Sequence, residues 1–350
     1  VNEKDNTTSL FQLRNQPLLS VITVLGTALA IALIMVILIV YQAKTADYAP
    51  EVNRSRSLYV KWERTVYDKK DPNSAGHSRP SLWLVKEIFY PLTTPEAVTA
   101  TYEGGEVLVG TVGSDEEMNT PLMLTDAAFW KVYQFRFLAG KPFTEADFQS
   151  GMKQAVIAKS VARRLFGGAE NAIGKDILVN FAAYTVCGVV DDVNRFCEFT
   201  WSEVYAPYTS NAIASEAEAG QTSGNNVITI LARSTDDFDA IRNEVARGVA
   251  QINTTLGDME LQLMGQPDNF RMQLNRKFAN QYENLNANFW KYGIMILIIL
   301  LVPAINLSGL TNTRMRRRLE ELGIRKAFGA TRNELVWQVL NENLVLTVMG

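Results

Sequence analysis

Few stretches of the sequence combine the residue types and the spacing that catalysis or nucleotide binding requires. The glycine-rich run from Gly167 to Asp176, GGAENAIGKD, superficially resembles a phosphate-binding loop. A P-loop places four residues between its first glycine and the Gly-Lys pair, and a serine or threonine follows the lysine. Here five residues separate Gly168 from Gly174, and Asp176 follows Lys175. This run is therefore not a P-loop, and no other stretch supplies one, so we predict that the chain has no ATPase activity of its own.

The other polar candidates do not form a catalytic group. The sequence contains no G-x-S-x-G nucleophile elbow. His77, the one histidine, lies in a polar stretch, which favours a surface position. Asp191 and Asp192 are adjacent at the end of an apolar run, and neighbouring residues of a strand point to opposite faces. We therefore predict no catalytic residue, no cofactor and no metal site, and hence no enzyme.

The two cysteines leave two interpretations open. Cys187 and Cys197 could form a disulfide in an oxidising compartment. Alternatively, both thiols stay free, with Cys187 buried in a strand. Two cysteines and one histidine are in either case too few for a disulfide framework or a structural zinc cluster.

Composition limits the class of protein. The chain has 350 residues, an apolar fraction of 47% and a formal net charge of -3. This is enough for one sizeable soluble core together with membrane spans. The negative charge argues against nucleic acid as a partner, because a nucleic-acid-binding domain usually carries a basic face.

The densest basic cluster is residues 311–335, TNTRMRRRLEELGIRKAFGATRNEL, which directly follow an apolar run. Basic residues beside a membrane span mark its cytoplasmic side. The apolar residues of this stretch that share one face at helical spacing are Leu319, Leu322 and Phe328. Gly329 suits the left-handed position that ends a helix, and Thr331 with Glu334 forms a capping box for a second helix. The stretch is either an anchor on anionic lipid or a docking helix for a cytoplasmic partner.

Two apolar runs predict membrane spans. Residues 18–41 carry no charge and are long enough to cross a bilayer as a helix. They are too long for the apolar part of a signal peptide, and a poor cleavage site follows, so we predict a retained span. A second span is predicted over residues 289–310, directly before the basic cluster. The cluster then places residues 1–17 and 311–334 in the cytoplasm and residues 42–288 outside.

Residues 42–288 predict an α+β extracytoplasmic domain of two lobes, inserted between the transmembrane helices. Residues 57–63 alternate like a strand, whereas residues 68–80 have the composition of a loop. Gly104 and Gly105 predict a hairpin turn between two strands. Asp126 is placed to cap a helix.

Three further patterns complete this domain. A helix ended by Gly167 and two strands around a turn are predicted between residues 159 and 190. Residues 227–264 read strand, helix, strand, which predicts a β-α-β unit. A polar helix is expected from Asn269 to Asn288, running into the second span.

The run from Glu320 to Arg332, EELGIRKAFGATR, resembles a segment of FtsX-, MacB- and LolE-type ABC transporter permeases, E-I-G-I-x-(K/R)-A-(I/L/F)-G-A-(S/T)-(R/K). Leu322 stands where the family usually has isoleucine. In that family this segment meets the ATP-binding subunit. The resemblance therefore implies ATPase-coupling roles for eight residues: Glu320, Glu321, Leu322, Gly323, Arg325, Lys326, Phe328 and Gly329.

Residues 129–190 resemble the MacB-type periplasmic core domain, with its G-(R/K)-x-F-x-x-x-D, A-x-x-L-F-G, I-G-K-x-I and V-x-G-V blocks. The matching positions are Gly140, Phe143, Asp147, Ala162, Leu165, Phe166, Gly167, Ile173, Gly174, Lys175, Val186, Gly188 and Val189. All are interpretable as structural residues, namely glycines at turns and apolar residues on buried faces.

Together the two resemblances imply a multi-pass permease subunit of an ABC transporter in a bacterial inner membrane. A separate cytoplasmic ATPase would drive motion of the periplasmic domain, for export or for mechanotransmission. A second permease, identical or different, is the expected partner, beside membrane lipid and a possible periplasmic protein. Residues 335–350 would begin a third span, and a fourth would follow. The alternatives are a two-span periplasmic sensor and a membrane-anchored periplasmic binding protein, and the sequence does not identify a substrate.

Overall fold

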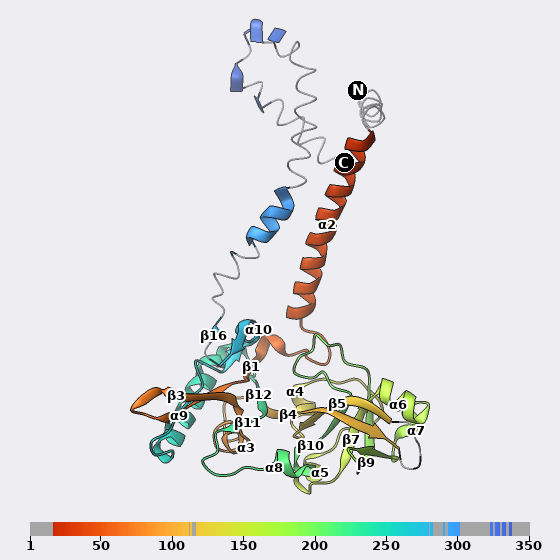
Figure 1. Ribbon diagram of the computed structural model, residues 1–350, viewed down its shortest axis with the longest axis vertical. Helices are drawn as coiled ribbons and strands as arrows, with labels where there is room; N and C mark the ends of the chain where they lie inside the picture. Colours follow the sequence, from red (N-terminus) through yellow and green to blue (C-terminus); the bar gives the residue numbers. More distant parts are fainter. Residues whose placement is uncertain are drawn as a thin grey trace. The chain divides into compact units, whose positions relative to one another are not determined.

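The computed structural model describes residues 17–111, 113, 117–279, 281–282, 290, 293–301, 323–324, 326–329, 331–333 and 336–337 (Figure 1). The chain divides into two compact units. One comprises Val1–Val40 together with Asn286–Gly350, and the other comprises Tyr41–Leu285. The second unit contains all the described strands and is where the soluble core lies.

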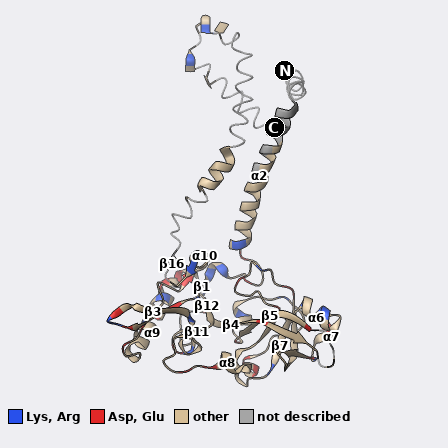
Figure 2. Cartoon of the chain, in the orientation of Figure 1, with Lys and Arg blue, Asp and Glu red and all other residues tan. Residues whose placement is uncertain are grey.

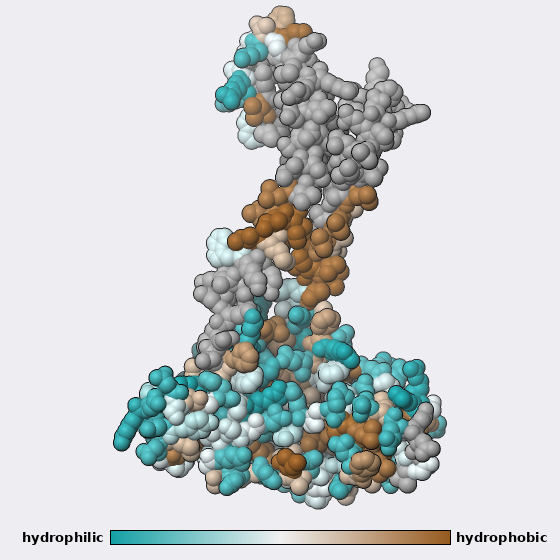
Figure 3. All heavy atoms as spheres, viewed as in Figure 1, coloured by the Kyte–Doolittle hydropathy of each residue, from teal (hydrophilic) through white to brown (hydrophobic). Residues whose placement is uncertain are grey.

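Helix α2 (Pro17–Thr45) covers the first predicted span. Its apolar side chains include Leu29, Ile31 and Met35, each more than half exposed. The described atoms of α2 and of residues 293–301, which are also helical, are mostly brown in Figure 3, and α2 is uncharged along its described length until its last turn (Figure 2). In the portion of the chain that the structure describes, no helix is both long enough and apolar enough to cross a membrane. The two spans at residues 18–41 and 289–310 thus remain predictions.

The Tyr41–Leu285 unit is a mixed α/β domain. Its strands are β1 (Ser57–Val60), β2 (Glu63–Asp68), β3 (Asp71–Pro80), β4 (Ala97–Gly110), β5 (Glu117–Thr125), β6 (Phe137–Gly140), β7 (Gln154–Ala158), β8 (Asp176–Val179), β9 (Ala182–Val190), β10 (Val204–Pro207), β11 (Ser223–Gly224), β12 (Asn226–Leu231), β13 (Glu260–Gln262), β14 (Asp268–Asn269), β15 (Arg276–Phe278) and β16 (Gln281–Tyr282). Its helices and helical turns are η1 (Arg54–Arg56), α3 (Leu82–Leu84), η2 (Val85–Phe89), α4 (Phe129–Val132), α5 (Glu145–Gln149), α6 (Lys159–Phe166), α7 (Ala169–Ala172), η3 (Tyr208–Ser210), α8 (Ala212–Ser215), η4 (Thr235–Asp237), α9 (Phe238–Thr255) and α10 (Phe270–Asn275).

A large sheet organises this domain. Its strand order is β14-β1-β12-β4-β5-β10-β7-β9-β6, and β8 pairs with β4 and β9. Most of the pairs are antiparallel, but β10 with β5 and β7 with β9 are parallel. Strand β7 is almost entirely buried, as expected of a strand covered on both faces.

A smaller sheet, in the order β11-β3-β2-β13, corrects one prediction. Residues 68–80 were expected to form a loop from their composition. Instead Asp71–Pro80 form strand β3, which pairs antiparallel with β2. Most of its side chains are exposed or half-buried. The backbone ladder holds the hairpin there without apolar alternation, so composition alone misassigned it.

Gly104 and Gly105 do not form a hairpin turn. Strand β4 runs unbroken past them, and its register with β5 shifts between Glu103 and Gly105. Gly105 has φ +72°, a conformation used both by tight turns and by glycine-containing β-bulges. The glycine pair was correctly identified as irregular, but the irregularity is a bulge.

The predicted β-α-β unit is also wrong, whereas the two lobes remain a prediction. The order strand, helix, strand is present as β12, α9 and β13, but β12 pairs with β1 and β4 in the large sheet whereas β13 pairs with β2 in the small one. Buried residues of α9 and β13, such as Ile241 and Leu261, belong to the same apolar core as those of the large sheet. This cluster therefore connects elements of both sheets within the Tyr41–Leu285 unit.

Within the described part of residues 269–288, the predicted polar helix is limited to α10. Helix α10 ends at Asn275, and β15 and β16 form a short antiparallel pair after it. Residues 283–288 lie outside the described part of the chain.

A second apolar cluster is rich in aromatic rings and is centred on Phe129, which is fully buried. Its ring centroid lies 5.1 Å from that of Trp130 and 4.9 Å from that of Tyr133. The backbone N–H of Phe129 donates to Asp126 Oδ1 at 3.0 Å, which confirms that Asp126 caps this helix. Burying a ring of this size stabilises the domain by about 1.5–3 kcal/mol.

Candidate functional site

The predicted coupling segment is described only in part. Glu320, Glu321, Leu322 and Arg325 lie outside the described residues. Phe328 is 88% exposed, and its N–H donates to Ile324 O at 3.0 Å, as in a helical turn. Gly329 follows with φ +96°, so the left-handed end of the helix is confirmed.

This turn presents a small apolar surface. Ile324 is 59% exposed, beside Phe328. A Cβ added at Gly323 would meet no atom within 4 Å, so its backbone is open to close approach. Lys326 is exposed as well. The turn thus offers two apolar side chains, a bare backbone position and a positive charge, a combination suited to a protein partner. Whether it binds an ATP-binding subunit stays a prediction.

The glycine-rich run after α6 cannot cradle a phosphate as it is folded. The Gly174 N–H donates to Val186 O at 2.9 Å, and the Lys175 N–H donates to Ala172 O at 3.1 Å. Phosphate-binding loops need such N–H groups to be free for the ligand. Gly167 ends α6 with φ 77°, which confirms its predicted role as a helix terminator.

The polar residues that were candidates for chemistry have structural partners. Asp191 accepts weak ion pairs from Arg136 and Lys159, each 3.6 Å long. Asp192 Oδ1 accepts the Ser160 N–H at 2.9 Å. His77 is exposed on β3, opposite Arg64 in the ladder. Among the described residues, no group of three or more His, Cys, Asp or Glu side chains could hold a metal ion.

Both cysteines are free, but Cys187 is half-buried in β9 rather than buried, whereas Cys197 is buried. Cys187 Sγ lies 3.4 Å from Ala155 O, and burial raises the pKa of this thiol to about 12. Burial also raises the pKa of Cys197 to about 11. Thiols with such pKa values are poor nucleophiles, so the interpretation with two free, inert cysteines is the one that the structure supports.

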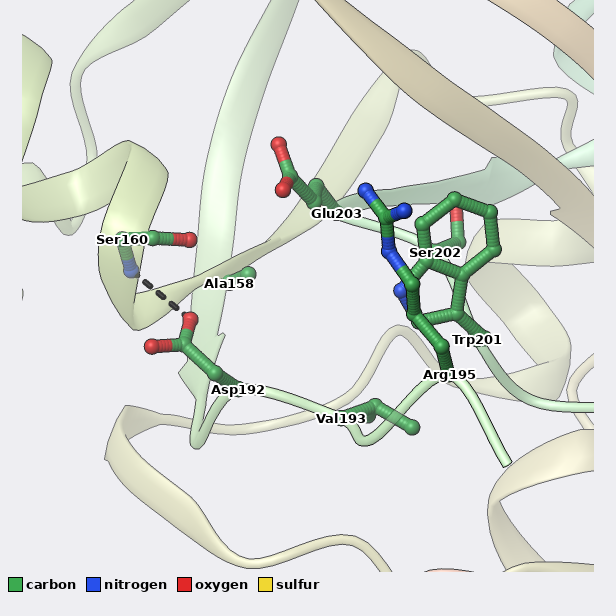
Figure 4. Close-up of a pocket in the computed structure, with 8 residues that line it drawn as sticks. All are labelled: Ala158, Ser160, Asp192, Val193, Arg195, Trp201, Ser202 and Glu203. Atoms are coloured by element: carbon green, nitrogen blue, oxygen red, sulfur yellow. Dashed lines mark hydrogen bonds between the residues drawn. The ribbon is translucent and has the colours of Figure 1, made fainter. Parts of the chain in front are cut away.

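A cavity of about 270 Å³ lies beside Asp192 (Figure 4). Arg195 stacks over the Trp201 ring with its Cζ 5.0 Å from the ring centroid. Glu203 accepts a hydrogen bond from Thr120. In Figure 4 the carboxylate of Asp192 turns toward Ser160, away from Arg195. These side chains form no nucleophile–base pair.

Sequence patterns gave no signal for two buried ion pairs. Arg54 and Glu51 are each 1% exposed and lie 2.7 Å apart. Arg276 and Asp268 are both fully buried and form a bidentate pair. Burial raises the pKa of Glu51 even though Arg54 and hydrogen bonds oppose the shift. An arginine in a polar stretch normally lies at the surface, so burial of this kind depends on tertiary structure.

The chain matches two family models. The model described as "MacB-like periplasmic core domain" matches residues 20–247. The model described as "FtsX-like permease C-terminal" matches residues 293–350. The chain is 23% identical over 336 residues to the uncharacterized ABC transporter permease YknZ of Bacillus subtilis. The alignment spans 95% of this chain and 79% of YknZ.

A second relative is longer than this chain. The macrolide export ATP-binding/permease protein MacB of Wolinella succinogenes is 25% identical over 339 residues, which are 95% of this chain but 48% of that protein. A solved structure, the extracellular domain of a YknZ transporter from Gram-positive bacteria, aligns with a TM-score of 0.42 at 19% identity, over 59% of this chain and 99% of that one. On the first family match, which covers more than half of its residues, the chain belongs to the family of ABC transporter permeases that carry a MacB-like periplasmic core domain.

Proposed function

We propose that this chain is a permease subunit that couples ATP hydrolysis by a separate cytoplasmic ATPase to motion of its periplasmic domain, for export or mechanotransmission. We assign the ATPase to a separate chain by analogy with YknZ. The relative YknZ, of which the alignment spans 79%, is named as a permease and not as an ATP-binding protein.

The proposal includes a membrane topology. Residues 18–41 and 289–310 cross the inner membrane, residues 42–288 are periplasmic, and residues 335–350 begin a third span. The exposed apolar side chains of α2 support the first span. The basic cluster at residues 311–335 supports a cytoplasmic location for the coupling segment. A second copy or a related permease completes the transporter.

The exposure of Phe328 is the observation that carries the docking role. A ring that is 88% exposed in a helical turn gains by being covered. Covering it fully is worth about 1.5–3 kcal/mol, so Phe328→Ala should weaken binding of the ATPase roughly ten- to a hundredfold. Gly323→Asp with Phe328→Glu should abolish binding, because it adds a side chain at the bare position and buries a charge.

The experiment is co-purification of the permease with the ATPase, followed by measurement of coupled ATP turnover. The control pair, Ile213→Asp with Phe181→Glu, changes two exposed residues of the Tyr41–Leu285 unit in the same chemical sense. We expect the control to bind and the Gly323→Asp/Phe328→Glu protein to lose binding while still inserting in the membrane. If the latter still binds the ATPase and supports full turnover, the docking role is wrong and the segment is a lipid-facing anchor.

A further inference from the structure

Two ion pairs stand apart from the rest by burial. In Arg54–Glu51 and Arg276–Asp268 neither side chain is more than 1% exposed. In each of the other ion pairs within the described residues, at least one side chain is 35% or more exposed. Both buried pairs lie near the ends of the Tyr41–Leu285 unit, the first just after α2 and the second in β14 and β15.

Arg54 holds the end of α2 to the domain. Its Nη1 donates to Ala46 O at 2.7 Å, directly after the last residue of α2, and its Nη2 donates to Phe196 O at 3.0 Å. Its Nε donates to Glu51 Oε2 at 2.7 Å. The other oxygen of Glu51 accepts the Phe199 N–H at 3.0 Å. The guanidinium therefore bonds two separate backbone segments, at Ala46 and at Phe196, and its partner Glu51 adds a bond to Phe199.

Arg276 does the same where the chain leaves the domain. It pairs with both carboxylate oxygens of Asp268. Its Nη1 donates to Ala279 O at 2.8 Å, and its Nη2 donates to Met264 O at 3.1 Å. The short strand β15 is thus fixed to β14 through a side chain.

Both attachments meet at strand β1. Asp268 is the ladder partner of Tyr59 in β1. The Tyr59 ring stacks on Phe199 with centroids 4.3 Å apart. Phe270 contacts both groups: its ring centroid lies 5.8 Å from that of Tyr59 and 4.8 Å from Arg54 Cζ.

Such attachments resist bending. Opening a buried pair leaves an uncompensated charge in apolar surroundings, and Arg can bond several partners at once because its donors form a planar fork. A hinge, by contrast, is a few residues that absorb backbone rotation freely. Neither the end of α2 nor the β15 segment therefore has the features of a hinge.

We propose that Arg54 and Arg276 are positioning residues of two clasps, which fix the entering and leaving segments to β1 so that both move the large sheet as one body. That an ATPase drives the displacement depends on the proposed function, whereas the stiffness of the two joints does not. The first measurement therefore needs no ATPase.

The first measurement is hydrogen exchange by mass spectrometry on the full chain in phospholipid nanodiscs. Glu51→Gln with Arg54→Met removes both charges but keeps an acceptor oxygen for Phe199 N–H. Exchange should rise about tenfold or more in residues 41–50 and 194–201 and stay unchanged in β7 and β9, because only the local opening becomes easier. Arg56→Met is the matched control, since Arg56 lies on the same turn and its pair with Glu96 is about one-third exposed. At the exit, Asp268→Asn with Arg276→Met is compared with Arg271→Met.

Unchanged exchange in residues 41–50 of the Glu51→Gln/Arg54→Met protein would overturn the entry clasp. If β7 and β9 also lose protection, the same exchange measurement is made on Arg54→Lys. This variant keeps a positive charge beside Glu51 but lacks the several N–H donors of the guanidinium. The same local rise is expected there, and its absence contradicts the proposal.

The second measurement separates the clasps from the source of motion. Spin labels replace Tyr41 and Ile213, which are 61% and 70% exposed, in a chain without Cys187 and Cys197. With the ATPase bound, the distance distribution should stay narrow in wild type with and without ATP, and broaden with ATP in the Glu51→Gln/Arg54→Met protein. A distribution equally narrow in both proteins, under ATP turnover that is itself intact, overturns the transmitting role. If the ATPase does not bind wild type, the proposed function fails, and the exchange measurement still decides the clasps.

Discussion

The substitution Gly140→Ala tests whether a glycine is required at this position of the core domain. Gly140 ends β6 with φ +66°, opposite Gly188 of β9. A Cβ at this position would lie 2.2 Å from Cys187 O and 2.7 Å from Ile173 Cδ1. The same Cys187 carbonyl accepts the Lys141 N–H at 3.0 Å. Gly140→Ala must therefore move backbone, because a carbonyl oxygen cannot swing away as a side chain does.

The expected loss combines three effects. Alanine in the left-handed region costs about 1–2 kcal/mol. Displacing β6 from β9 to relieve an overlap costs roughly 1–3 kcal/mol, as overpacking usually does. Alanine also restricts the unfolded chain, which offsets about 0.4–1 kcal/mol. The net destabilisation should be about 1–5 kcal/mol.

Urea denaturation of the full chain in detergent, followed by tryptophan fluorescence, measures this loss. Trp130 is a suitable reporter, because its ring centroid lies 5.5 Å from that of Phe137 at the start of β6. Gly174→Ala is the matched control: its φ is +75°, but an added Cβ meets nothing within 4 Å. The control should lose only about 1 kcal/mol. Equal losses in the two variants would show that backbone conformation alone, and not the contact with β9, explains Gly140.

Two further predictions concern buried carboxyl groups. Asp126→Ala should destabilise the domain by about 2–4 kcal/mol in the same assay, because it leaves the Ala100 and Phe129 N–H groups without their acceptor. A loss below about 1 kcal/mol would contradict the assigned cap. Burial raises the pKa of Glu63, whose carboxylate accepts hydrogen bonds from hydroxyls such as those of Thr65 and Ser223. A carboxyl whose pKa is raised in the folded state stabilises the fold below its unfolded pKa of about 4.3, and this stabilisation is lost as the pH rises through the folded pKa. The free energy of unfolding, measured from about pH 4 to 8, should therefore fall more steeply in wild type than in Glu63→Gln. Parallel pH profiles would refute this account.

Local signals in the sequence predicted local structure well. Gly167 and Gly329 end helical segments, and Asp126 caps α4, because each depends on a few neighbouring residues. Strand β3 was missed because its residues are mostly polar and its pairing with β2 is made by the backbone. The order β12, α9, β13 was read correctly, yet sequence order cannot say which sheet a strand joins.

The candidate site also contains features that the sequence predicts and features that it does not. The exposed turn at Phe328 follows from helical spacing and a glycine, both of which are visible in the sequence. The clasps at Arg54 and Arg276 are invisible there, since the partners of Arg54 include Phe196, 142 residues away. A buried arginine is recognised only when the fold brings its acceptors together.

Neither of the two fully buried ion pairs lines the cavity at Asp192. An enzyme concentrates perturbed and unpaired polar groups around a cavity. Here the groups beside the cavity at Asp192 are bonded to backbone, hydroxyl or ring partners. The two fully buried ion pairs lie instead where the chain joins α2 and where it leaves β14. Charge buried at joints stiffens them, because each pair opens only at a high electrostatic cost. If the two joints act as proposed above, substitutions at Arg54 and Arg276, more than substitutions beside the cavity, should separate motion from folding.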